Sequence, residues 1–239
     1  MSGRADAIKR DPLGVAIADF YQSGRDVPIE VRINGKQDAP MLPSLFFRTY
    51  AKMKGYERLA LRMCRGSVLD IGAAAGCHSV ILQKRNLDVT ALEISPLACA
   101  VLASRGVRRI LNENIFDVKG IEFNTVLMLM NGLGMAGSEE GTAKLLRHLK
   151  RMLAHKGMIL GDSTDILYNT MDVNKAFDEK ENYYGQVEFR LKYNGVEADP
   201  FQWIYLDPAL LAELCDKVGL QCQILHRDEN FHYLAKITK

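Results

Sequence analysis

The spacing of hydrophobic residues changes several times along the chain, between the alternating or unbroken runs of strands and the three-to-four-residue spacing of helices. We predict strands near residues 67–71, 88–92, 108–111, 123–130, 157–162, 221–227 and 231–238. We predict helices between them near residues 76–86, 96–106, 138–154 and 207–219. Strands that alternate with helices favour a doubly wound α/β fold with a largely parallel sheet.

The last two predicted strands are joined by only three residues, Asp228 to Asn230. Parallel neighbours need a crossover connection of a dozen or more residues, so these two strands must pair as an antiparallel hairpin. We therefore expect a seven-stranded, Rossmann-like sheet that ends in a C-terminal antiparallel hairpin.

Two segments fall outside this α/β core. Within residues 1–60, helical spacing over Pro12–Gln22, alternation over Ile29–Ile33 and helical spacing over Leu45–Leu61 predict an N-terminal cap. Residues 166–206 form an insertion in which two alternating runs predict a β-hairpin above the carboxyl ends of the strands. We expect one domain overall, with a cap at 1–60 and a core at 61–239 that carries the insertion.

Aromatic side chains of the cap and the insertion are candidates to cover a ligand. The cap supplies Phe20, Tyr21, Phe46, Phe47 and Tyr50 as lid residues, and the insertion supplies Tyr183, Tyr184, Trp203 and Tyr205. We predict that substrate contacts Tyr21, Tyr50, Tyr183, Tyr184 and Trp203. Packing of these side chains within their own elements is the alternative.

Composition excludes few functions but disfavours some partners. The chain has 239 residues, with 31 basic and 29 acidic side chains and a net charge of +2, so no strong field attracts nucleic acid or an anionic membrane. The five cysteines and five histidines show no metal-ligand spacing, so we expect no metal. The first residues contain no signal-like apolar run, and we expect a cytoplasmic protein without membrane association.

The clearest chemical signal is the loop that follows the first predicted core strand. The run Val68-Leu69-Asp70-Ile71 leads into Gly72-Ala73-Ala74-Ala75-Gly76, and a helix follows. Residues this small allow a ligand to lie against the backbone, and the helix start offers unpaired N–H groups. The Gly-x-Gly-x-x-Gly pattern of dinucleotide sites is absent, because positions 74 and 77 are Ala74 and Cys77.

An acidic residue ends the next predicted strand. Glu93 lies 17 positions after Gly76, and its carboxylate has two oxygens that can accept hydrogen bonds from both hydroxyls of a ribose. Such an acid serves any ribose-containing cofactor, so Glu93 alone does not separate one nucleotide from another. A surface acid at a strand end is the alternative.

The sequence V-L-D-I-G-x-x-x-G resembles motif I of the class I S-adenosylmethionine-dependent methyltransferases, and residues 69 to about 165 resemble small bacterial members of that family. A parallel sheet closed by an antiparallel hairpin is typical of it. Ala74 replaces the central glycine of the motif, and its methyl group fits if residue 74 has a negative φ. The resemblance implies contacts to S-adenosylmethionine from Asp70, Gly72, Ala73, Ala74, Gly76, Glu93, Ile94, Asn114, Ile115, Met130 and Asn131.

The resemblance implies methyl transfer by in-line displacement, with S-adenosylhomocysteine as the product, but it reaches no substrate-defining motif. We expect a small-molecule acceptor that is methylated on nitrogen or oxygen and contacts Asn131. His78 and Asp162 are the candidate general bases by position. Transfer to RNA or protein, or a catalytically silent S-adenosylmethionine-binding protein, are the alternatives.

Overall fold

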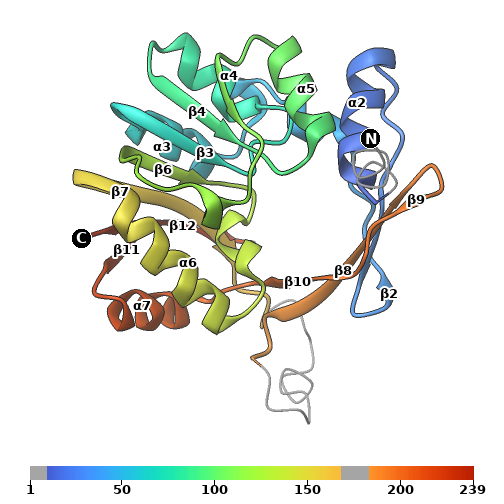
Figure 1. Ribbon diagram of the computed structural model, residues 1–239. Coiled ribbons are helices and arrows are strands. Elements are labelled where there is room, and N and C mark those ends of the chain that lie inside the picture. The colour runs from blue at the N-terminus through green and yellow to red at the C-terminus, as the bar shows by residue number, and fades with distance from the viewer. Residues whose placement is uncertain (1–9, 168–182) are drawn as a thin grey trace. The chain divides into compact units, whose positions relative to one another are not determined.

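The computed structural model, drawn in Figure 1, describes residues 10–167 and 183–239. Its larger sheet has seven strands. The strand order is β11-β12-β7-β6-β3-β4-β5. The strands are β3 (Ser67–Ile71), β4 (Asp88–Leu92), β5 (Arg109–Leu111), β6 (Phe123–Met128), β7 (Leu153–Thr164), β11 (Gln221–Arg227) and β12 (His232–Thr238). The pairs β4–β5 and β6–β7 are parallel, whereas β12 is antiparallel to both β7 and β11. The predicted Rossmann-like sheet with a C-terminal hairpin is confirmed.

The chain divides into two compact units, which are described separately. The described residues of the first unit are 10–53, 70–117 and 188–201. The described residues of the second unit are 54–69, 118–167, 183–187 and 202–239.

In the first unit, three helices accompany β4 and β5: α2 (Pro12–Ser23), α4 (Cys77–Lys84) and α5 (Pro96–Ser104). Helix α2 packs against α5. A short 3-10 helix, η3 (Ile115–Asp117), follows β5. The predicted helices at 76–86 and 96–106 are therefore confirmed, with ends two residues shorter.

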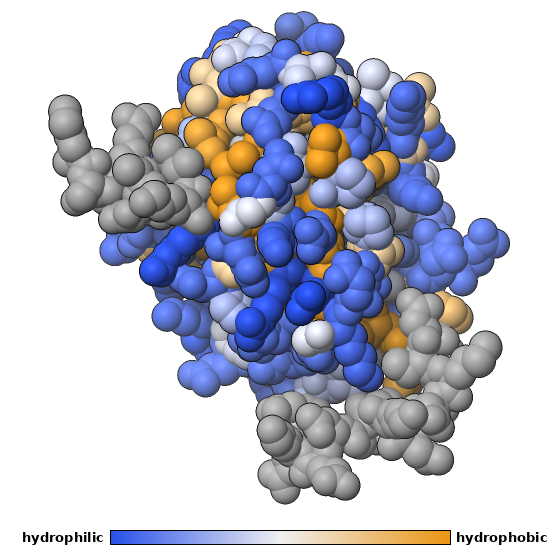
Figure 2. All heavy atoms as spheres, turned by 90° about the vertical axis from the view of Figure 1, so that its right-hand side faces the viewer, coloured by the Kyte–Doolittle hydropathy of each residue, from blue (hydrophilic) through white to orange (hydrophobic). Residues whose placement is uncertain are grey.

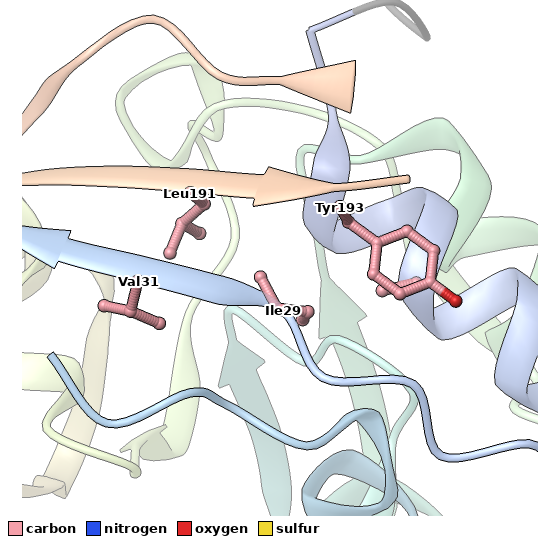
Figure 3. Packing of buried hydrophobic residues seen from close by; sticks show 5 residues of the cluster. Ile29, Val31, Leu191 and Tyr193 are labelled. Carbon is pink, nitrogen blue, oxygen red and sulfur yellow. The ribbon is translucent and has the colours of Figure 1, made fainter. Parts of the chain in front are cut away.

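A second, smaller sheet joins the two segments that sequence analysis placed outside the core. Its order is β10-β8-β1-β2, and β9 pairs with β8. The strands are β1 (Glu30–Ile33), β2 (Lys36–Gln37), β8 (Gln186–Tyr193), β9 (Val196–Glu197) and β10 (Phe201–Ile204). Figure 3 shows Val31 and Leu191 on the neighbouring strands β1 and β8, close to Ile29 and Tyr193. Burial of these side chains stabilises the pairing of two segments far apart in sequence.

The predicted helix over Leu45–Leu61 is wrong, because this segment forms three short helices. They are η1 (Pro43–Phe47), η2 (Tyr50–Lys52) and α3 (Gly55–Met63). The backbone of Met53 and Lys54 is extended, and the Lys54 N–H donates to Glu57 Oε2 at 2.8 Å. This carboxylate caps a new helix at Gly55, so the helical periodicity of the sequence spans two breaks that it does not reveal.

In the second unit, α6 (Glu139–Met152) and α7 (Pro208–Lys217) lie side by side (Figure 1). A 3-10 helix, η4 (Gly132–Ala136), follows β6 and packs against β7 and α6. Within the described ranges, no helix is both long enough and apolar enough to cross a membrane.

Candidate active site

The loop after β3 is held in a compact turn by its own backbone. Gly72 and Gly76 have φ values of 70° and 78°, in the left-handed region that favours glycine. The N–H of Gly72 donates to the Leu92 carbonyl at 2.9 Å, which ties the loop to the end of β4. An ideal Cβ on Gly76 would lie 2.6 Å from Cδ2 of Leu102, so a side chain there is excluded by both space and backbone geometry.

Ala74 also has a positive φ, of 48°, so the negative φ at which its methyl group would fit most easily is not the one that this residue adopts. The reason is a hydrogen bond, since this backbone turns the Ala74 N–H toward Glu93 Oε2, at 2.8 Å. An alanine in the left-handed region costs free energy that a glycine avoids. The methyl group is therefore accommodated in a conformation that the sequence does not predict for alanine.

Both oxygens of the Glu93 carboxylate accept backbone hydrogen bonds. Oε2 accepts from Ala74, and Oε1 accepts from the Ser95 N–H at 2.9 Å. Only 9% of Glu93 is exposed, and this burial raises the pKa of its carboxyl above the ordinary value. Each carboxylate oxygen has a second lone pair, so the ion can still accept two hydroxyl groups.

Asn112 is a residue of this site that sequence analysis missed. Its Nδ2 donates to the carbonyl oxygens of Glu93 and Ile94, both at 2.9 Å, and so fixes the backbone at the end of β4. The only sign of Asn112 in the sequence is that a polar residue directly follows β5, the strand parallel to β4.

An exposed apolar side chain lies beside the acid. Ile94 is 67% exposed, more than any other large apolar side chain in the described part of the chain. Figure 2 shows one face of the molecule, which is mainly hydrophilic with apolar areas between the polar ones. Exposure of a large aliphatic side chain next to a carboxylate suits a ligand that has a flat ring attached to a sugar.

Asp70 and His78 lie beneath the loop. Asp70 is 2% exposed and accepts a 2.5 Å hydrogen bond from the Ser79 hydroxyl, which joins β3 to the first turn of α4. Burial raises the pKa of the Asp70 carboxyl, while His78 and Ser79 act in the opposite direction. His78, the first predicted base, is itself only 6% exposed.

Asn114 and Ile115 follow β5 in the first unit. Asn114 is exposed, and its Oδ1 accepts the Phe116 N–H at 3.0 Å, which begins the turn into η3. Ile115 is 8% exposed. One lone pair of the Asn114 amide oxygen thus remains for another donor.

In the second unit, the turn after β6 places two successive residues at positive φ. Met130 and Asn131 have φ values of 65° and 60°. The Asn131 N–H donates to both carboxylate oxygens of Asp162 at 3.1 Å, and the Thr164 hydroxyl donates to Asn131 Oδ1 at 2.8 Å. Asp162, the second predicted base, has 0% exposure. These contacts fix both the backbone and the amide plane of Asn131.

Three of the five predicted aromatic substrate residues lie in the second unit, and the other two lie in the first. In the second unit, Tyr184 donates to Asp165 Oδ1 and Tyr183 donates to Asp207 Oδ2, both at 2.8 Å, and burial raises the pKa of both phenols. Trp203 packs so closely on η4 that a Cβ on Gly134 would clash with its indole nitrogen.

The two predicted substrate residues of the cap lie in the first unit. The Tyr21 hydroxyl donates to the Ser104 carbonyl at 3.2 Å. Tyr50 is 37% exposed and belongs to η2.

Comparison with known proteins places the chain in a family. None of the protein-family models matches it, and no curated protein matches it. A crystal structure of an S-adenosylmethionine-dependent methyltransferase from Bacteroides fragilis, in complex with S-adenosyl-L-homocysteine, shares 36% sequence identity over 96% of this chain and 95% of that chain, with a TM-score of 0.88. The chain belongs to the S-adenosylmethionine-dependent methyltransferases. This methyltransferase therefore uses S-adenosylmethionine as its cofactor.

More distant structures share the fold of this methyltransferase. The sugar N-methyltransferase KedS8 from a Streptoalloteichus species is 17% identical with a TM-score of 0.54, over 83% of this chain and 93% of that chain. CalS10, an amino pentose methyltransferase from Micromonospora echinaspora, is 12% identical with a TM-score of 0.53, over 79% of this chain and 93% of that chain.

Proposed function

We propose that this methyltransferase transfers a methyl group to a nitrogen or oxygen atom of a small molecule. The fixed amide of Asn131 is the observation that carries the proposal, because a preoriented polar group at the end of a strand recognises a discrete polar acceptor. The fold is shared with two methyltransferases described as acting on sugars, and the net charge of +2 gives no field for nucleic acid.

We propose that the first unit holds the cofactor through the loop after β3 and the end of β4. Gly72, Ala73, Ala74 and Gly76 carry no side chain larger than a methyl group, so an amino-acid moiety can approach the backbone of this loop, of which Gly72 is exposed. Glu93 accepts the ribose hydroxyls on its two remaining lone pairs. When bound, the cofactor supplies an electrophilic methyl group on a sulfonium.

The adenine ring is assigned to the apolar and amide groups that follow β4 and β5. In this proposal, Ile94 covers one face of the adenine ring and Ile115 contacts the ring from the start of η3. Asn114 accepts a hydrogen of the adenine amino group through the second lone pair of its amide oxygen. Asp70 has an indirect role, because its carboxylate accepts the Ser79 hydroxyl and so holds the end of β3 against the first turn of α4.

We propose that the second unit supplies the acceptor contacts. The Thr164 hydroxyl donates to Asn131 Oδ1 and so fixes which way the amide points. The Asn131 side-chain NH₂ is thereby oriented to donate a hydrogen bond to an oxygen or nitrogen atom of the small molecule. Asp165 Oδ1 accepts from the Tyr184 hydroxyl and from Leu167 N–H, and among the described residues nothing is bonded to Oδ2. Asp165 can therefore accept a hydrogen from a substrate amine or hydroxyl, a task for which buried Asp162 is poorly placed.

Two experiments test this proposal. The first supplies the enzyme with S-adenosylmethionine and separate pools of small amines and alcohols, RNA, and protein, and measures S-adenosylhomocysteine release. Release with the small-molecule pool alone supports the proposal, whereas release only with RNA or protein contradicts it. Cofactor binding without release from any pool would indicate a silent binding protein.

The second experiment uses matched asparagine variants. Asn131→Gly removes the amide but keeps a residue that tolerates positive φ, and we expect kcat/KM for the acceptor to fall about 10- to 100-fold. Asn86→Gly is the control, since Asn86 also has a positive φ, of 61°, but follows α4. Equal activity of the two variants would contradict the role of Asn131.

A further inference from the structure

Arg105, the residue that follows α5, contacts two segments with the same guanidinium. One is the loop proposed to bind the cofactor (residues 72–76, called the cofactor loop), and the other is the N-terminal segment from α2 to η2 (residues 12–52). Its Nη1 donates to the carbonyl of Ala75, a fully buried residue of the loop. Its Cζ lies over the Phe47 ring, 4.8 Å from the ring centre, so the cation interacts with the face of an aromatic side chain of η1. All three residues belong to the first unit.

Phe47 is part of an aromatic cluster with Phe20 and Tyr21 of α2. The ring centres of Phe20 and Phe47 are 4.8 Å apart, and those of Tyr21 and Phe47 are 6.3 Å apart with nearly parallel planes. The Tyr21 hydroxyl also donates to the carbonyl of Ser104, the residue before Arg105. The aromatic cluster is thus attached to the end of α5 by two different interactions.

A second link connects α2 to the proposed ribose-binding acid. Asp11, the N-cap of α2, accepts the Gly14 N–H on Oδ1 at 2.7 Å and the Ser95 hydroxyl on Oδ2 at 2.5 Å. The Ser95 N–H in turn donates to Glu93. A Cβ on Gly14 would clash with both Asp11 and Ser95, so the close approach of α2 to α5 depends on this glycine.

We propose that Arg105 is a positioning residue that couples the N-terminal segment to the cofactor loop, so that cofactor affinity depends on the aromatic cluster. This inference rests on the proposed assignment of the loop to the cofactor. Arg105 fixes the Ala75 carbonyl and hence the loop backbone, but only while Phe47 keeps the guanidinium in place. Because coupling between two sites is reciprocal, cofactor binding must stabilise the N-terminal segment by the same factor.

The test measures S-adenosylhomocysteine affinity by calorimetry in Arg105→Gln, Arg105→Lys and Phe47→Leu. We expect Kd to rise about tenfold in Arg105→Gln and in Phe47→Leu. Arg105→Lys keeps the charge but lacks the planar face, so it should restore affinity only in part. In the double variant Arg105→Gln/Phe47→Leu, the loss should be smaller than the product of the single losses, because both act through one contact.

Arg109→Gln is the matched control. Arg109 also lies in the first unit, but it forms an exposed ion pair with Asp88, and its replacement should leave Kd unchanged.

Hydrogen exchange provides a readout that a purely structural role would not move. In the unmodified protein, S-adenosylhomocysteine should slow amide exchange in η1 and α2, and in Arg105→Gln this ligand-dependent slowing should disappear. Folded Arg105 variants with unchanged Kd and unchanged slowing would overturn the inference. If instead the unmodified protein binds S-adenosylhomocysteine and Gly72→Val binds it equally well, the proposed site itself is wrong.

Discussion

The turns that follow β3 and β6 solve the same backbone problem with different consequences. In each turn a residue other than glycine takes a positive φ, Ala74 in the first unit and Asn131 in the second. In each, the N–H of that residue donates to a carboxylate in or directly after the strand that comes next in sequence, Asp162 in β7 or Glu93 after β4. Hydrogen bonds to a carboxylate are charge-assisted, so each can offset the conformational free energy of a left-handed residue.

The two turns differ in the exposure of the carboxylate and in how its oxygens are hydrogen-bonded. Glu93 directly follows β4, is 9% exposed and accepts the N–H groups of Ala74 and Ser95 on different oxygens. Asp162 lies within β7, has no exposure, and accepts the Asn131 N–H on both of its oxygens. In the proposed function, the first arrangement leaves Glu93 to bind a ligand, whereas in the second Asp162 supports the backbone of Asn131, whose amide is proposed to bind the substrate.

The largest effect is expected from Gly72→Val. The φ of 70° at this position is strained for valine, and the side chain would stand where the ligand approaches the backbone. We expect no detectable S-adenosylhomocysteine binding by calorimetry. Gly120→Val is the control, because Gly120 has a φ of 73° and open space around it. A folded Gly72→Val protein with normal affinity would refute the role of the first turn.

The second effect concerns Glu93→Gln, which exchanges a charged acceptor for a neutral one. We expect S-adenosylhomocysteine to bind about 10- to 100-fold more weakly. In the unmodified protein, affinity should fall as the pH drops through the raised pKa of Glu93, above its ordinary value near 4.5, because the protonated carboxyl is a poorer acceptor.

The same ionisation has the opposite effect on the ligand-free fold. A raised folded-state pKa means that the contribution of Glu93 to stability falls as the pH rises from 4.5 through that pKa. Calorimetric titrations from about pH 5 to pH 8 check the binding trend. An identical pH dependence in Glu93→Gln would show that another group is responsible.

Asp162→Asn should act on stability rather than on the cofactor. Asparagine keeps one oxygen for the Asn131 N–H but replaces the other oxygen with an NH₂, which cannot accept that hydrogen bond. We therefore expect the free energy of unfolding to fall by about 1–3 kcal/mol. Urea denaturation measures this change, and the S-adenosylhomocysteine Kd should stay the same. Asp199→Asn, at an exposed ion pair with Arg10, is the control and should show no measurable change. A loss of cofactor affinity equal to that of Glu93→Gln would remove the distinction between the two acids.

Ala74→Gly should give the smallest change, with a sign that is informative. Glycine relieves the left-handed strain at φ 48° but adds freedom to the unfolded chain, for a net stabilisation of about 0.5–1 kcal/mol. Thermal unfolding measures it. Ala75→Gly is the control, because Ala75 is buried and has no positive φ, so glycine there adds freedom to the unfolded chain, removes a buried methyl group and should lower stability. Destabilisation of both variants alike would mean that residue 74 is not strained.

Local patterns in the sequence were sufficient for the core sheet and for the first turn. The three-residue link at Asp228–Asn230 forces a hairpin, and small residues between a strand and a helix indicate a ligand loop. Both features depend on residues close together in the chain. The positive φ of Ala74 was not predictable, because it depends on Glu93 in the next strand.

Contacts between distant segments explain what sequence analysis missed. The pairing of β1 with β8 brings together residues about 160 positions apart, for example Val31 and Leu191, and alternation alone does not identify a partner strand. Asp162 was predicted as a base from its position near the end of a strand, but β7 continues through Thr164 and encloses it. Tyr21 was predicted as a substrate contact, and its placement beside Phe47 depends on folding of the whole N-terminal segment.

The most direct test of the account is a crystal structure of this methyltransferase with S-adenosylhomocysteine. The account predicts that both ribose hydroxyls donate to Glu93 while the N–H groups of Ala74 and Ser95 stay on the same carboxylate. A ribose bound elsewhere, with Glu93 contacting only those two backbone groups, would contradict it.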